Sequence, residues 1–501
     1  MKLGELLKGV QINQFRGDPG LEIEGLAYDS RRVKPGYLFV ALRGHQKDGH
    51  DYITDALRAG AVALVAERTE GFEGKAAWVS VNNPRRALSE LAVGFYRRPF
   101  EGLNLIGITG TNGKTTTSYL LESILSAAGI STGVIGTINY RYSGKNHPAP
   151  VTTPESLDLM GLLREMTDEG VTDVIMEVSS HALDQKRTED CPFRVAVFTN
   201  LSRDHLDYHE TMDAYFLAKS RLFCGLKQGE DGGKTRAVIN MDDPRGGRLA
   251  DLTDVEVMTY GLGPGCQVRA ASVSADRKGI KARLITPLGE RAISSPLLGE
   301  FNVYNIMAAS AAALALDLSL EVVTEGIARL KTIPGRLEWV ENKRELQIIV
   351  DYAHTPDALS KAINVLRPLV EGKLITVFGC GGDRDQGKRY EMGLAAGRDS
   401  DIVLVTSDNP RSEEPSAIMG QIEKGVQETG SKRLDRPLGG RSGYFMEVNR
   451  RKAIRKAVSM ARDKDLILIA GKGHEDYQII GQERRSFDDR KEAALAALEG
   501  V

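Results

Sequence analysis

The chain has 501 residues, of which 41% are hydrophobic and 27% are charged, and it carries a formal net charge of -2. This length is too great for one hydrophobic core and predicts two to four domains, and the near-zero charge provides no basic footprint for nucleic acid. Its four cysteines lie far apart, no apolar run approaches the length of a membrane span, and the N-terminus lacks a signal-peptide core. We therefore expect a reduced, cytoplasmic protein without membrane insertion.

The first predicted domain covers residues 1–98 and is a small α/β unit. Apolar runs predict strands at 38–42 and 61–66, and helical periodicity predicts helices at 52–59 and 86–96. A Pro- and Gly-containing linker follows these elements and ends the domain.

Two polar clusters of this domain, YDSRR at 28–32 and RGHQKDGHDY at 43–52, fall between these elements. Their composition is typical of surface loops. Their basic and histidine side chains, beside a serine, could instead hold an anionic, hydroxyl-rich ligand. Composition leaves both interpretations open.

A glycine-rich segment, LNLIGITGTNGKTTTSYL, follows at 103–120. Its apolar start predicts a buried strand, and the periodicity of 119–128 predicts a helix. Between them, glycines let backbone N–H groups approach phosphates, Lys114 can reach the terminal phosphates, and a threonine hydroxyl can hold Mg²⁺. The strict phosphate-loop pattern requires glycine at the position of Ile108, whereas this chain has Gly110. We therefore predict a nucleotide-binding loop with irregular glycine spacing.

The second predicted domain, residues 99–332, has strands that end in polar residues. The predicted strands, each with the residue that follows it, are 174–176 with Glu177, 195–199 with Asn200, and 237–239 with Asn240. Helical segments between them favour a doubly wound parallel sheet, which binds ligands outside the carboxyl ends of its strands. These residues should share an edge with the phosphate loop.

Three side chains near this edge offer metal chemistry. Glu177 could bind Mg²⁺ or form a strand-end salt bridge. His205, in DHLDYH, could be a second ligand or a loop histidine bonded to Asp204 or Asp207. Lys219, in AYFLAKSRLF, has the sequence context of a solvated lysine on a helix face.

An alanine-rich helix is predicted within 293–318, after a Gly-Asn turn. Asn302 and Asn305 lie near its start, where they could cap the helix or contact a nucleotide. Pro334 and Gly335 then mark the boundary of a third domain.

The third predicted domain, residues 333–501, repeats the pattern of strand and polar loop. Its predicted strands are 346–350, 374–378, 402–406 and 466–470. The loops after the last three of these strands contain Arg384, Asp408, Asn409, Arg411 and Glu475. Arginines suit carboxylates and acidic side chains suit an ammonium group, so we predict a site for a zwitterion.

Taken together, several motifs identify the chain as a member of the Mur ligase family. They are GITGTNGKTTT, VTTP, EVSSHALDQKR, DHLDYH, the AYFLAK lysine, GEFNVYN, GRLE, DYAHTP and DNPR. The resemblance runs from about Tyr28 to Tyr477, and the family's loop has the GTNGKTT form, which accounts for Ile108. It implies three α/β domains: a small N-terminal domain for a UDP-sugar, a central P-loop doubly wound ATPase domain, and a C-terminal Rossmann-like domain for the incoming amino acid.

The resemblance also implies roles for individual residues. Those implied to contact the UDP-sugar are Tyr28, Ser30, His45, Gln46 and Lys47. Those implied to hold the muramoyl-dipeptide are Thr152, Thr153, Ser179, Gln185 and Arg187. Those implied to bind ATP are Gly110, Thr111, Asn112, Gly113, Lys114, Thr115, Thr116, Asn302, Arg336, Asp351 and His354. Those implied to bind the amino acid are Arg384, Asp408, Asn409, Pro410, Arg411, Gly471 and Glu475.

The catalytic residues that the resemblance implies are Lys114, Glu177, His205 and Lys219. The implied magnesium ligands are Thr115, Glu177, His205 and Lys219, the last as a carbamate formed from CO₂. A carbamate turns the lysine cation into a carboxylate-like ligand. This implied role differs from the solvated lysine that the residue alone favours.

The DNPR motif at 408–411 resembles that of family members that add meso-diaminopimelate to UDP-N-acetylmuramoyl-L-alanyl-D-glutamate. Arg384 and Arg411 could clamp the second carboxylate of diaminopimelate, whereas lysine would leave an arginine unpaired. The implied reaction is ATP-dependent amide formation through an acyl phosphate, in peptidoglycan precursor synthesis. The alternatives are a lysine-adding ligase, a folylpolyglutamate synthase and an ATP-gated binding module. We expect a monomer with these small-molecule substrates and without a nucleic-acid partner.

Overall fold

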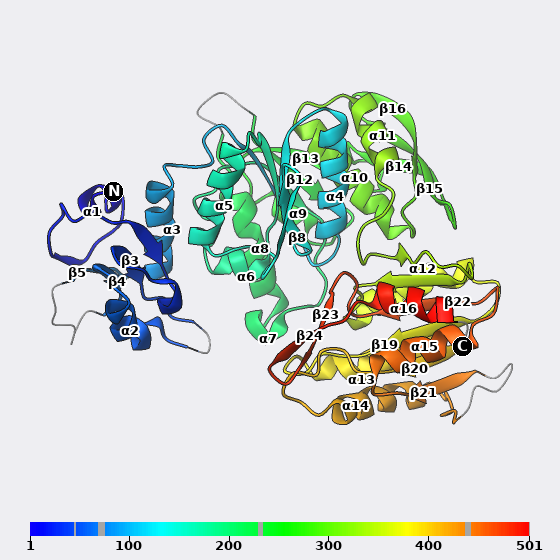
Figure 1. The fold of residues 1–501 in the computed structure, drawn as a ribbon. Coiled ribbons are helices and arrows are strands. Elements are labelled where there is room, and N and C mark those ends of the chain that lie inside the picture. The colour runs from blue at the N-terminus through cyan, green and yellow to red at the C-terminus, as the bar shows by residue number, and fades with distance from the viewer. Residues whose placement is uncertain (45–46, 69–75, 229–233, 436–441, 500–501) are drawn as a thin grey trace. The chain divides into compact units, whose positions relative to one another are not determined.

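A computed structural model describes residues 1–44, 47–68, 76–228, 234–435 and 442–499. Figure 1 shows its helices and strands. The chain divides into two compact units. Unit 1 comprises Met1–Arg269, Thr286–Leu288 and Met307–Gly326, and unit 2 comprises Ala270–Ile285, Gly289–Ile306 and Ile327–Val501.

The first sheet of unit 1 has the strand order β1-β5-β4-β3-β2 and is parallel except for β1. Its strands are β1 (Gln14–Arg16), β2 (Gly25–Ala27), β3 (Tyr37–Val40), β4 (Ala63–Ala66) and β5 (Ala77–Ser80). The helices of this region are α1 (Leu3–Leu6), η1 (Ser30–Arg32), η2 (Gly49–Tyr52), α2 (Ile53–Arg58) and α3 (Pro84–Phe95). The sequence predicted β3, β4, α2 and α3, with boundaries shifted by at most two residues.

The second sheet of unit 1 has the order β13-β12-β11-β6-β10-β7-β8-β9. Its strands are β6 (Asn104–Thr109), β7 (Thr132–Ile135), β8 (Asn139–Tyr142), β9 (Lys145–Pro148), β10 (Asp173–Glu177), β11 (Phe193–Phe198), β12 (Arg236–Asn240) and β13 (Glu256–Tyr260). All pairings are parallel except those of β8 and β9. Because β6 pairs in parallel with both β10 and β11, the ends of these three strands meet at one edge, as the sequence predicts.

Helices accompany this second sheet. They are α4 (Lys114–Ala127), α5 (Ser156–Asp168), α6 (Ser180–Asp184), α7 (Leu206–His209), α8 (Met212–Cys224), α9 (Gly246–Ala250), α10 (Phe301–Ala315) and α11 (Leu320–Arg329). The prediction that the helix after the glycine loop begins at 119 is wrong. It begins at Lys114, because Gly113 at φ +89° turns the chain directly into the helix.

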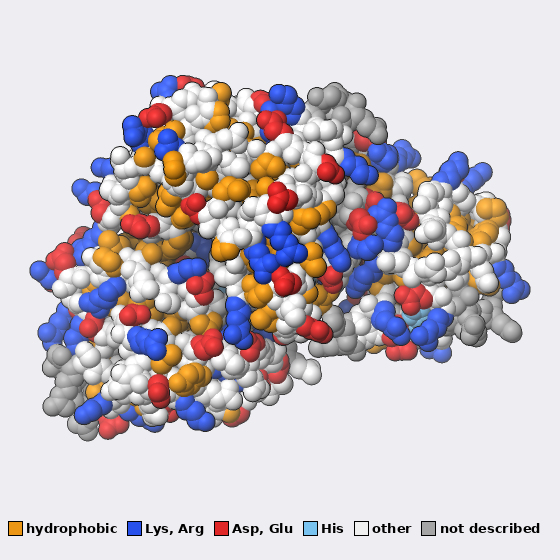
Figure 2. All heavy atoms as spheres, turned by 180° about the vertical axis from the view of Figure 1, so that it is seen from behind, with side chains coloured by type: hydrophobic (Ala, Val, Ile, Leu, Met, Phe, Trp, Pro, Cys, Tyr) orange, Lys and Arg blue, Asp and Glu red, His pale blue; other side chains and the backbone are white. Residues whose placement is uncertain are grey.

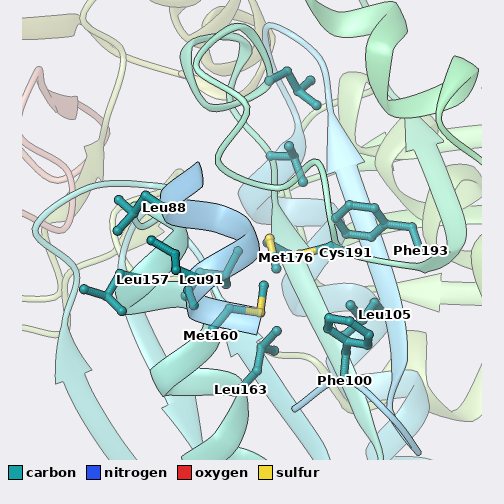
Figure 3. Packing of buried hydrophobic residues seen from close by; sticks show 14 of the residues in the cluster. Leu88, Leu91, Phe100, Leu105, Leu157, Met160, Leu163, Met176, Cys191 and Phe193 are labelled. Atoms are coloured by element: carbon teal, nitrogen blue, oxygen red, sulfur yellow. The ribbon is translucent and has the colours of Figure 1, made fainter. Parts of the chain in front are cut away.

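A shared hydrophobic core joins α3 to α5 and to one face of the second sheet (Figure 3). Its members include Leu88 and Leu91 of α3, Leu157, Met160 and Leu163 of α5, and Leu105 and Met176 of the sheet. All are nearly or fully inaccessible to solvent. Burying one such leucine stabilises the fold by about 1.5–3 kcal/mol, so this contact holds α3 firmly within unit 1.

The main sheet of unit 2 has the order β17-β18-β22-β19-β20-β21 and is parallel except for β17. Its strands are β17 (Glu338–Trp339), β18 (Gln347–Asp351), β19 (Leu374–Phe378), β20 (Ile402–Val405), β21 (Gly443–Met446) and β22 (Leu466–Ala470). The four strands predicted for this region are confirmed to within one residue. A two-stranded ribbon, β23 (Tyr477–Ile480) with β24 (Glu483–Ser486), and a three-stranded sheet, β14 (Arg269–Asp276), β15 (Gly279–Thr286) and β16 (Gly289–Ser295), complete the strands.

Helices cover both faces of this parallel sheet. They are α12 (Pro356–Leu366), η3 (Arg367–Leu369), α13 (Gly387–Asp399), α14 (Pro415–Glu428), α15 (Arg450–Met460) and α16 (Asp489–Glu499). Ile349 points into a core with α12, α13 and α14, whereas Ile348 and Val350 point into a second core with α15 and α16. Successive residues of a strand face opposite sides, so the continuous apolar runs of this region suit a sheet buried on both faces.

The surface mixes charges of both signs. Figure 2 shows basic and acidic side chains interspersed over the face that it displays. Among the described residues, no helix has the length and apolar character that crossing a membrane would require.

Candidate active site

The glycine-rich loop joins β6 to α4 and is fixed to the end of β11. Gly110 has φ +149°, and a side chain there would overlap the hydroxyl of Thr199. Asn200 accepts hydrogen bonds from the backbone N–H groups of Thr111 (2.8 Å, to its carbonyl) and Asn112 (3.0 Å, to its side chain). The conformation of the loop therefore depends on the neighbouring strand as well as on its own glycines.

Lys114 is the first residue of α4 and folds back over the loop. Its Nζ donates to the carbonyl oxygens of Gly110 at 2.8 Å and Thr111 at 2.9 Å. The first turn of a helix presents N–H groups without intrahelical partners, and its dipole favours negative charge. Together with Lys114, the start of α4 is suited to phosphate groups.

Glu177, the last residue of β10, has a carboxylate held by threonines. The side chain is 1% exposed and accepts hydrogen bonds from Thr115 Oγ1 at 3.0 Å, from Thr137 Oγ1 at 2.8 Å and from Thr137 N at 3.1 Å. The alternative of a strand-end salt bridge is wrong, since the ion pairs of the described residues do not include Glu177. A carboxylate beside a threonine hydroxyl provides the hard oxygen ligands that Mg²⁺ prefers.

Lys219 is buried, in contrast to the solvated lysine that its sequence context favours. Its side chain is 2% exposed, and α8 directs Nζ to the carbonyl of Gly110 at 3.0 Å and to the ring of Tyr215 at 4.7 Å. Burial, reinforced by the positive charge of Lys114, holds the pKa of Lys219 well below its usual value. This amine therefore loses its proton more readily than the amine of a solvated lysine.

His205 lies next to the same tyrosine, just before α7. It has φ +55°, and its ring centroid is 6.0 Å from that of Tyr215 and 4.9 Å from that of His181. Its Nε2 is 3.4 Å from Asp204, which is the loop contact that the sequence offered as one alternative. Burial lowers the pKa of His205 although Asp204 opposes the shift.

Tyr215 links these groups to the glycine loop, since its hydroxyl is 3.1 Å from Thr111 Oγ1. Neither Tyr215 nor Thr137 was predicted from the sequence. Thr137 follows β7, a strand that the sequence analysis did not assign. Among the described residues, no three His, Cys, Asp or Glu side chains form a group that could hold a metal ion.

The residues implied to hold the dipeptide meet directly beyond β10. Thr153 Oγ1 donates to the carbonyl of Glu177 at 2.8 Å and accepts from the N–H of Ser179 at 3.0 Å. Arg187 donates to the carbonyl of Thr153 at 2.9 Å and to Gln185 at 2.7 Å. Thr152 contacts the hydroxyl of Thr137 at 3.1 Å.

The residues implied to contact the UDP-sugar are more dispersed. Tyr28 donates to Asp158 of α5, which Arg32 also contacts at 2.8 Å; Asp158 was not predicted. Ser30 begins η1, and Lys47 lies 5.9 Å from the ring centroid of Tyr52. His45 and Gln46 lie outside the described residues.

Unit 2 contains the remaining residues implied to bind ATP. Asn302 lies inside α10 and donates to the carbonyl of Leu298 at 2.7 Å, so of its two alternatives, capping the helix or contacting a nucleotide, it does not cap the helix. Arg336 lies 4.8 Å from the ring of Tyr352, and His354 Nδ1 is 2.9 Å from the Tyr352 carbonyl.

Asp351 ends β18 and accepts hydrogen bonds from the N–H groups of Leu337 at 2.7 Å and Ala353 at 2.8 Å. Burial raises the pKa of Asp351, against the opposing charge of Arg336. The carboxylate thus joins the GRLE and DYAHTP segments at one end of the sheet.

Arg384 and Arg411 flank one glycine of the loop after β19. A Cβ on Gly381 would lie 3.0 Å from Arg411 Nη1 and 3.8 Å from Arg384 Cγ. Arg411 has φ +52° and donates to the carbonyl of Gly382 at 2.7 Å, whereas Arg384 is exposed. Both arginines that the sequence assigned to a carboxylate therefore lie beside Gly381, and the Arg411 guanidinium is bonded to the backbone of the same loop.

The acidic part of this set lies at the ends of β20 and β22. Asn409 donates to Glu475 at 2.9 Å, and Pro410 accepts from the N–H of Glu413 at 3.1 Å. Gly471 has φ +114°, and a Cβ there would lie 2.6 Å from Asp408 Oδ2, so glycine is required beside this carboxylate.

Burial acts in the same direction on the pKa values of both carboxylates, but the charges that surround them differ. It would raise the pKa of Asp408, but the charges of Lys472 and Arg450 outweigh burial and lower the pKa. For Glu475, burial and the neighbouring charge of Asp408 raise the pKa. Lys472 is not among the site residues predicted from the sequence.

Comparison with protein-family models gives three matches along the chain. Residues 22–96 match the model described as Mur ligase family, catalytic domain. Residues 108–313 match the Mur ligase middle domain, and residues 335–473 match the Mur ligase, glutamate ligase domain.

Relatives match over almost the whole chain. The UDP-N-acetylmuramoyl-L-alanyl-D-glutamate--2,6-diaminopimelate ligase of Geobacter metallireducens is 49% identical, covering 100% of this chain and 99% of the relative. The ligase of the same name from Geobacillus kaustophilus is 45% identical over 96% of each chain. A solved structure of a ligase of this name has a TM-score of 0.68 and 33% identity, and covers 100% of this chain and 99% of its own.

Proposed function

Because the chain belongs to the Mur ligase family, we propose that it is the ATP-dependent ligase that joins meso-diaminopimelate to UDP-N-acetylmuramoyl-L-alanyl-D-glutamate. The observation that carries this choice of amino acid is the pair of arginines at Gly381, with Asp408, Asn409 and Glu475 grouped on neighbouring loops. The relatives named above are diaminopimelate ligases.

Diaminopimelate has an additional ammonium and carboxylate at the end that does not react. In the proposed complex, Arg384 and Arg411 pair with that carboxylate, and Glu475 with Asn409 receives the ammonium. Lysine has an ammonium but no carboxylate at this end, so it would leave the arginines unpaired. An unmade charge-assisted contact of this kind costs about 1–3 kcal/mol.

The reaction proceeds in two steps. A carboxylate oxygen of the UDP-linked dipeptide attacks the γ-phosphorus of ATP, and the bond to the β,γ-bridging oxygen breaks and releases ADP. The diaminopimelate amine then attacks the carbonyl carbon of the acyl phosphate, phosphate leaves and the amine loses a proton. The protein positions these groups and neutralises their charge rather than forming a covalent bond to them.

The loop at Gly110–Thr116 holds the ATP phosphates in this mechanism. Lys114 turns from the carbonyls of its own loop toward the terminal phosphates and offsets the charge that develops during transfer. The family resemblance also assigns nucleotide contacts to Asn302, Arg336, Asp351 and His354.

Magnesium fits the oxygen ligands beside this loop, Thr115 and Glu177, with His205 and a carbamate on Lys219 as further ligands. When bound, the ion neutralises phosphate charge during transfer. Lys219 is buried next to the Gly110 carbonyl without an acidic partner in the ion pairs of the described residues. Addition of its neutral amine to CO₂, with loss of one proton, would place an anion near the cationic Lys114.

The dipeptide and the UDP-sugar belong on unit 1 in this proposal. Thr152, Thr153, Ser179, Gln185 and Arg187 hold the dipeptide, and Tyr28, Ser30 and Lys47 contact the sugar nucleotide. We place the domain boundaries near residues 98 and 332, and propose a cytoplasmic monomer.

Comparison of amino acids tests the function. ADP release with ATP and the UDP-linked dipeptide is measured with meso-diaminopimelate and with L-lysine. We expect kcat/KM for diaminopimelate to be about 10–100-fold higher, from the cost of leaving an arginine unpaired. Equal values would contradict diaminopimelate specificity, higher values for lysine would favour the lysine-adding version, and glutamate addition to a folate would favour a folylpolyglutamate synthase.

A further inference from the structure

We propose that Lys472 is a positioning residue of the amino-acid site, which holds Asn409 and Glu475 in the arrangement that receives an ammonium group. This inference rests on the proposed function. Lys472 lies between Gly471 and Gly473, two residues beyond the end of β22, and its side chain is fully buried. A lysine is almost never fully buried unless its charge is partnered, so its contacts determine what it can do.

The ammonium of Lys472 joins three parts of the chain. Nζ donates to the carbonyl of Tyr477 at 2.7 Å and to Asn409 Oδ1 at 2.9 Å. It also lies 3.4 Å from Asp408 Oδ1 and 3.4 Å from Glu475 Oε2. Two short bonds to neutral oxygens and two longer ion pairs use all of its donor capacity within the protein. Lys472 therefore has no N–H group left to donate to a ligand, so it can position neighbouring side chains but does not itself contact the ligand.

Lys472 determines which way the Asn409 side chain points. Asn409 Oδ1 accepts both from Lys472 and from the N–H of Ile479 at 2.9 Å. Two donors on the same oxygen fix the amide, so its NH₂ group faces Glu475 Oε2 at 2.9 Å. The amide cannot rotate without losing both bonds.

The same contacts leave one face of Glu475 available. Its Oε2 is engaged by Asn409 and Lys472, whereas Oε1 makes no hydrogen bond among the described residues. The side chain is 16% exposed. Oε1 is thus the oxygen that a ligand ammonium would meet, and its direction is fixed by the two bonds to Oε2.

Charge balance points to the same role. Asp408 and Glu475 contribute two negative charges and Lys472 one positive charge, which leaves a single negative charge for one ammonium. The other buried cation nearby, Arg450, is bonded to Asp489 at 2.7 and 2.8 Å. Without Lys472 the two carboxylates would repel each other, and Glu475 would bind a proton in place of the ligand ammonium.

Substitution of Lys472 tests this inference in the full-length enzyme. Lys472→Met removes the charge and keeps the apolar part of the side chain. We expect the KM for meso-diaminopimelate to rise at least 30-fold, while the KM values for ATP and the UDP-linked dipeptide change less than twofold. Lys472→Arg, which keeps the charge with a different shape, should give a KM for meso-diaminopimelate between those of Lys472→Met and the unmodified enzyme.

Val458→Ala is the matched control, because Val458 is a buried core residue of α15 in the same unit. It should lower the thermal midpoint and leave all three KM values unchanged. A folded Lys472→Met enzyme with the original KM for meso-diaminopimelate would overturn the inference, as would a uniform rise of all three KM values. If Lys472→Met does not fold, Lys472→Arg decides by the same comparison of KM values, and an unchanged KM for meso-diaminopimelate overturns the inference.

Failure of the proposed function and failure of the proposed role of Lys472 give different results. If the unmodified enzyme releases ADP no faster with meso-diaminopimelate present than without it, the function is wrong before any variant is considered. If the unmodified enzyme is active and Lys472→Met binds meso-diaminopimelate equally well, only the role of Lys472 is wrong.

Discussion

Two buried lysines of this protein have opposite surroundings. Lys472 of unit 2 is within 3.4 Å of two carboxylates, which compensate its charge. Lys219 of unit 1 has a carbonyl oxygen and an aromatic ring as its contacts. A buried ammonium without a counter-charge tends to lose its proton, which makes Lys219 the one suited to covalent modification and Lys472 the one suited to a fixed structural charge.

Replacement of Lys219 by alanine is therefore expected to remove most of the activity. Lys219→Ala should lower kcat at least 100-fold, since no other side chain can supply the proposed carbamate oxygens, and added formate or acetate should restore part of it. ADP release measures both effects. Ser220→Ala, which alters the neighbouring helix residue, should retain activity. Full activity of Lys219→Ala would contradict the proposed carbamate.

His474 provides a prediction about pH. Its Nδ1 has no hydrogen-bond partner among the described residues, and burial with the charge of Arg336 lowers its pKa to about 3. In the unfolded chain it binds a proton near its usual pKa of 6.5, so the unfolded state binds more protons between these values. The stability of the fold should fall as the pH drops from 6.5 toward 3.

Between pH 7 and pH 4.5, the variant His474→Asn should lose less folding free energy than the unmodified protein, by on the order of 3 kcal/mol. Denaturant unfolding at pH 7 and pH 4.5 measures the difference, with the exposed His147→Asn as the control. Equal losses for the unmodified protein and His474→Asn would show that His474 does not cause the acid sensitivity.

At the scale of elements, the turn between β6 and α4 depends on Gly110. Thr199, which follows the neighbouring strand β11, leaves no room for a side chain at this position. Gly110→Ala would place a methyl group against Thr199 and force a residue with a side chain to φ +149°. We expect a shift of the loop that raises the KM for ATP at least tenfold and lowers stability by about 1–3 kcal/mol.

Gly129→Ala, at a site with open space and φ +74°, is the control for backbone strain alone. It should reduce stability without changing the KM for ATP, because Gly129 lies beyond the other end of α4. Similar KM values for both variants would contradict a specific role for Gly110.

Sequence patterns predicted some elements much better than others. The strands of the unit 2 sheet were predictable because continuous apolar runs mark strands that are buried on both faces. The segment that forms β14, β15 and β16 was not assigned, since its exposed residues interrupt every apolar run. The start of α4 was missed because Lys114 and three threonines carry no helical periodicity, although Gly113 turns the chain there.

Site residues were predictable where a motif carries them and not where only contacts reveal them. Glu177 stands at a strand end, where threonine hydroxyls donate to its carboxylate, and Arg384 and Arg411 stand in polar loops beside Gly381. Thr137 and Lys472 act through bonds to residues distant in the sequence, which no local pattern records. For Lys219, the residue alone favoured solvent exposure, and only its tertiary contacts reveal its burial.

For the molecule as a whole, activity should depend on a divalent cation. Removal of metal with EDTA should abolish ADP release and added Mg²⁺ should restore it, because phosphoryl transfer needs charge neutralisation that Lys114 alone does not supply. Thr115→Val should raise the Mg²⁺ concentration needed for half-maximal activity at least fivefold.

Thr235→Val is the control for this effect, since the Thr235 hydroxyl is also buried but donates to the carbonyl of Lys227. It should leave the Mg²⁺ dependence unchanged. Activity that persists in EDTA, with substrates freed of metal, would contradict a catalytic metal ion.

Because α3 shares a hydrophobic core with α5, the first hundred residues cannot readily be replaced by the corresponding domain of another protein. A fragment beginning at residue 99 would present the Leu157, Met160 and Leu163 face of α5 to water and would tend to aggregate. Asp158 of this fragment would also lose its two hydrogen-bond donors, the hydroxyl of Tyr28 and the guanidinium of Arg32. Supplying residues 1–98 as a separate chain should rescue the solubility of such a fragment, so protein engineers should transplant these two pieces together.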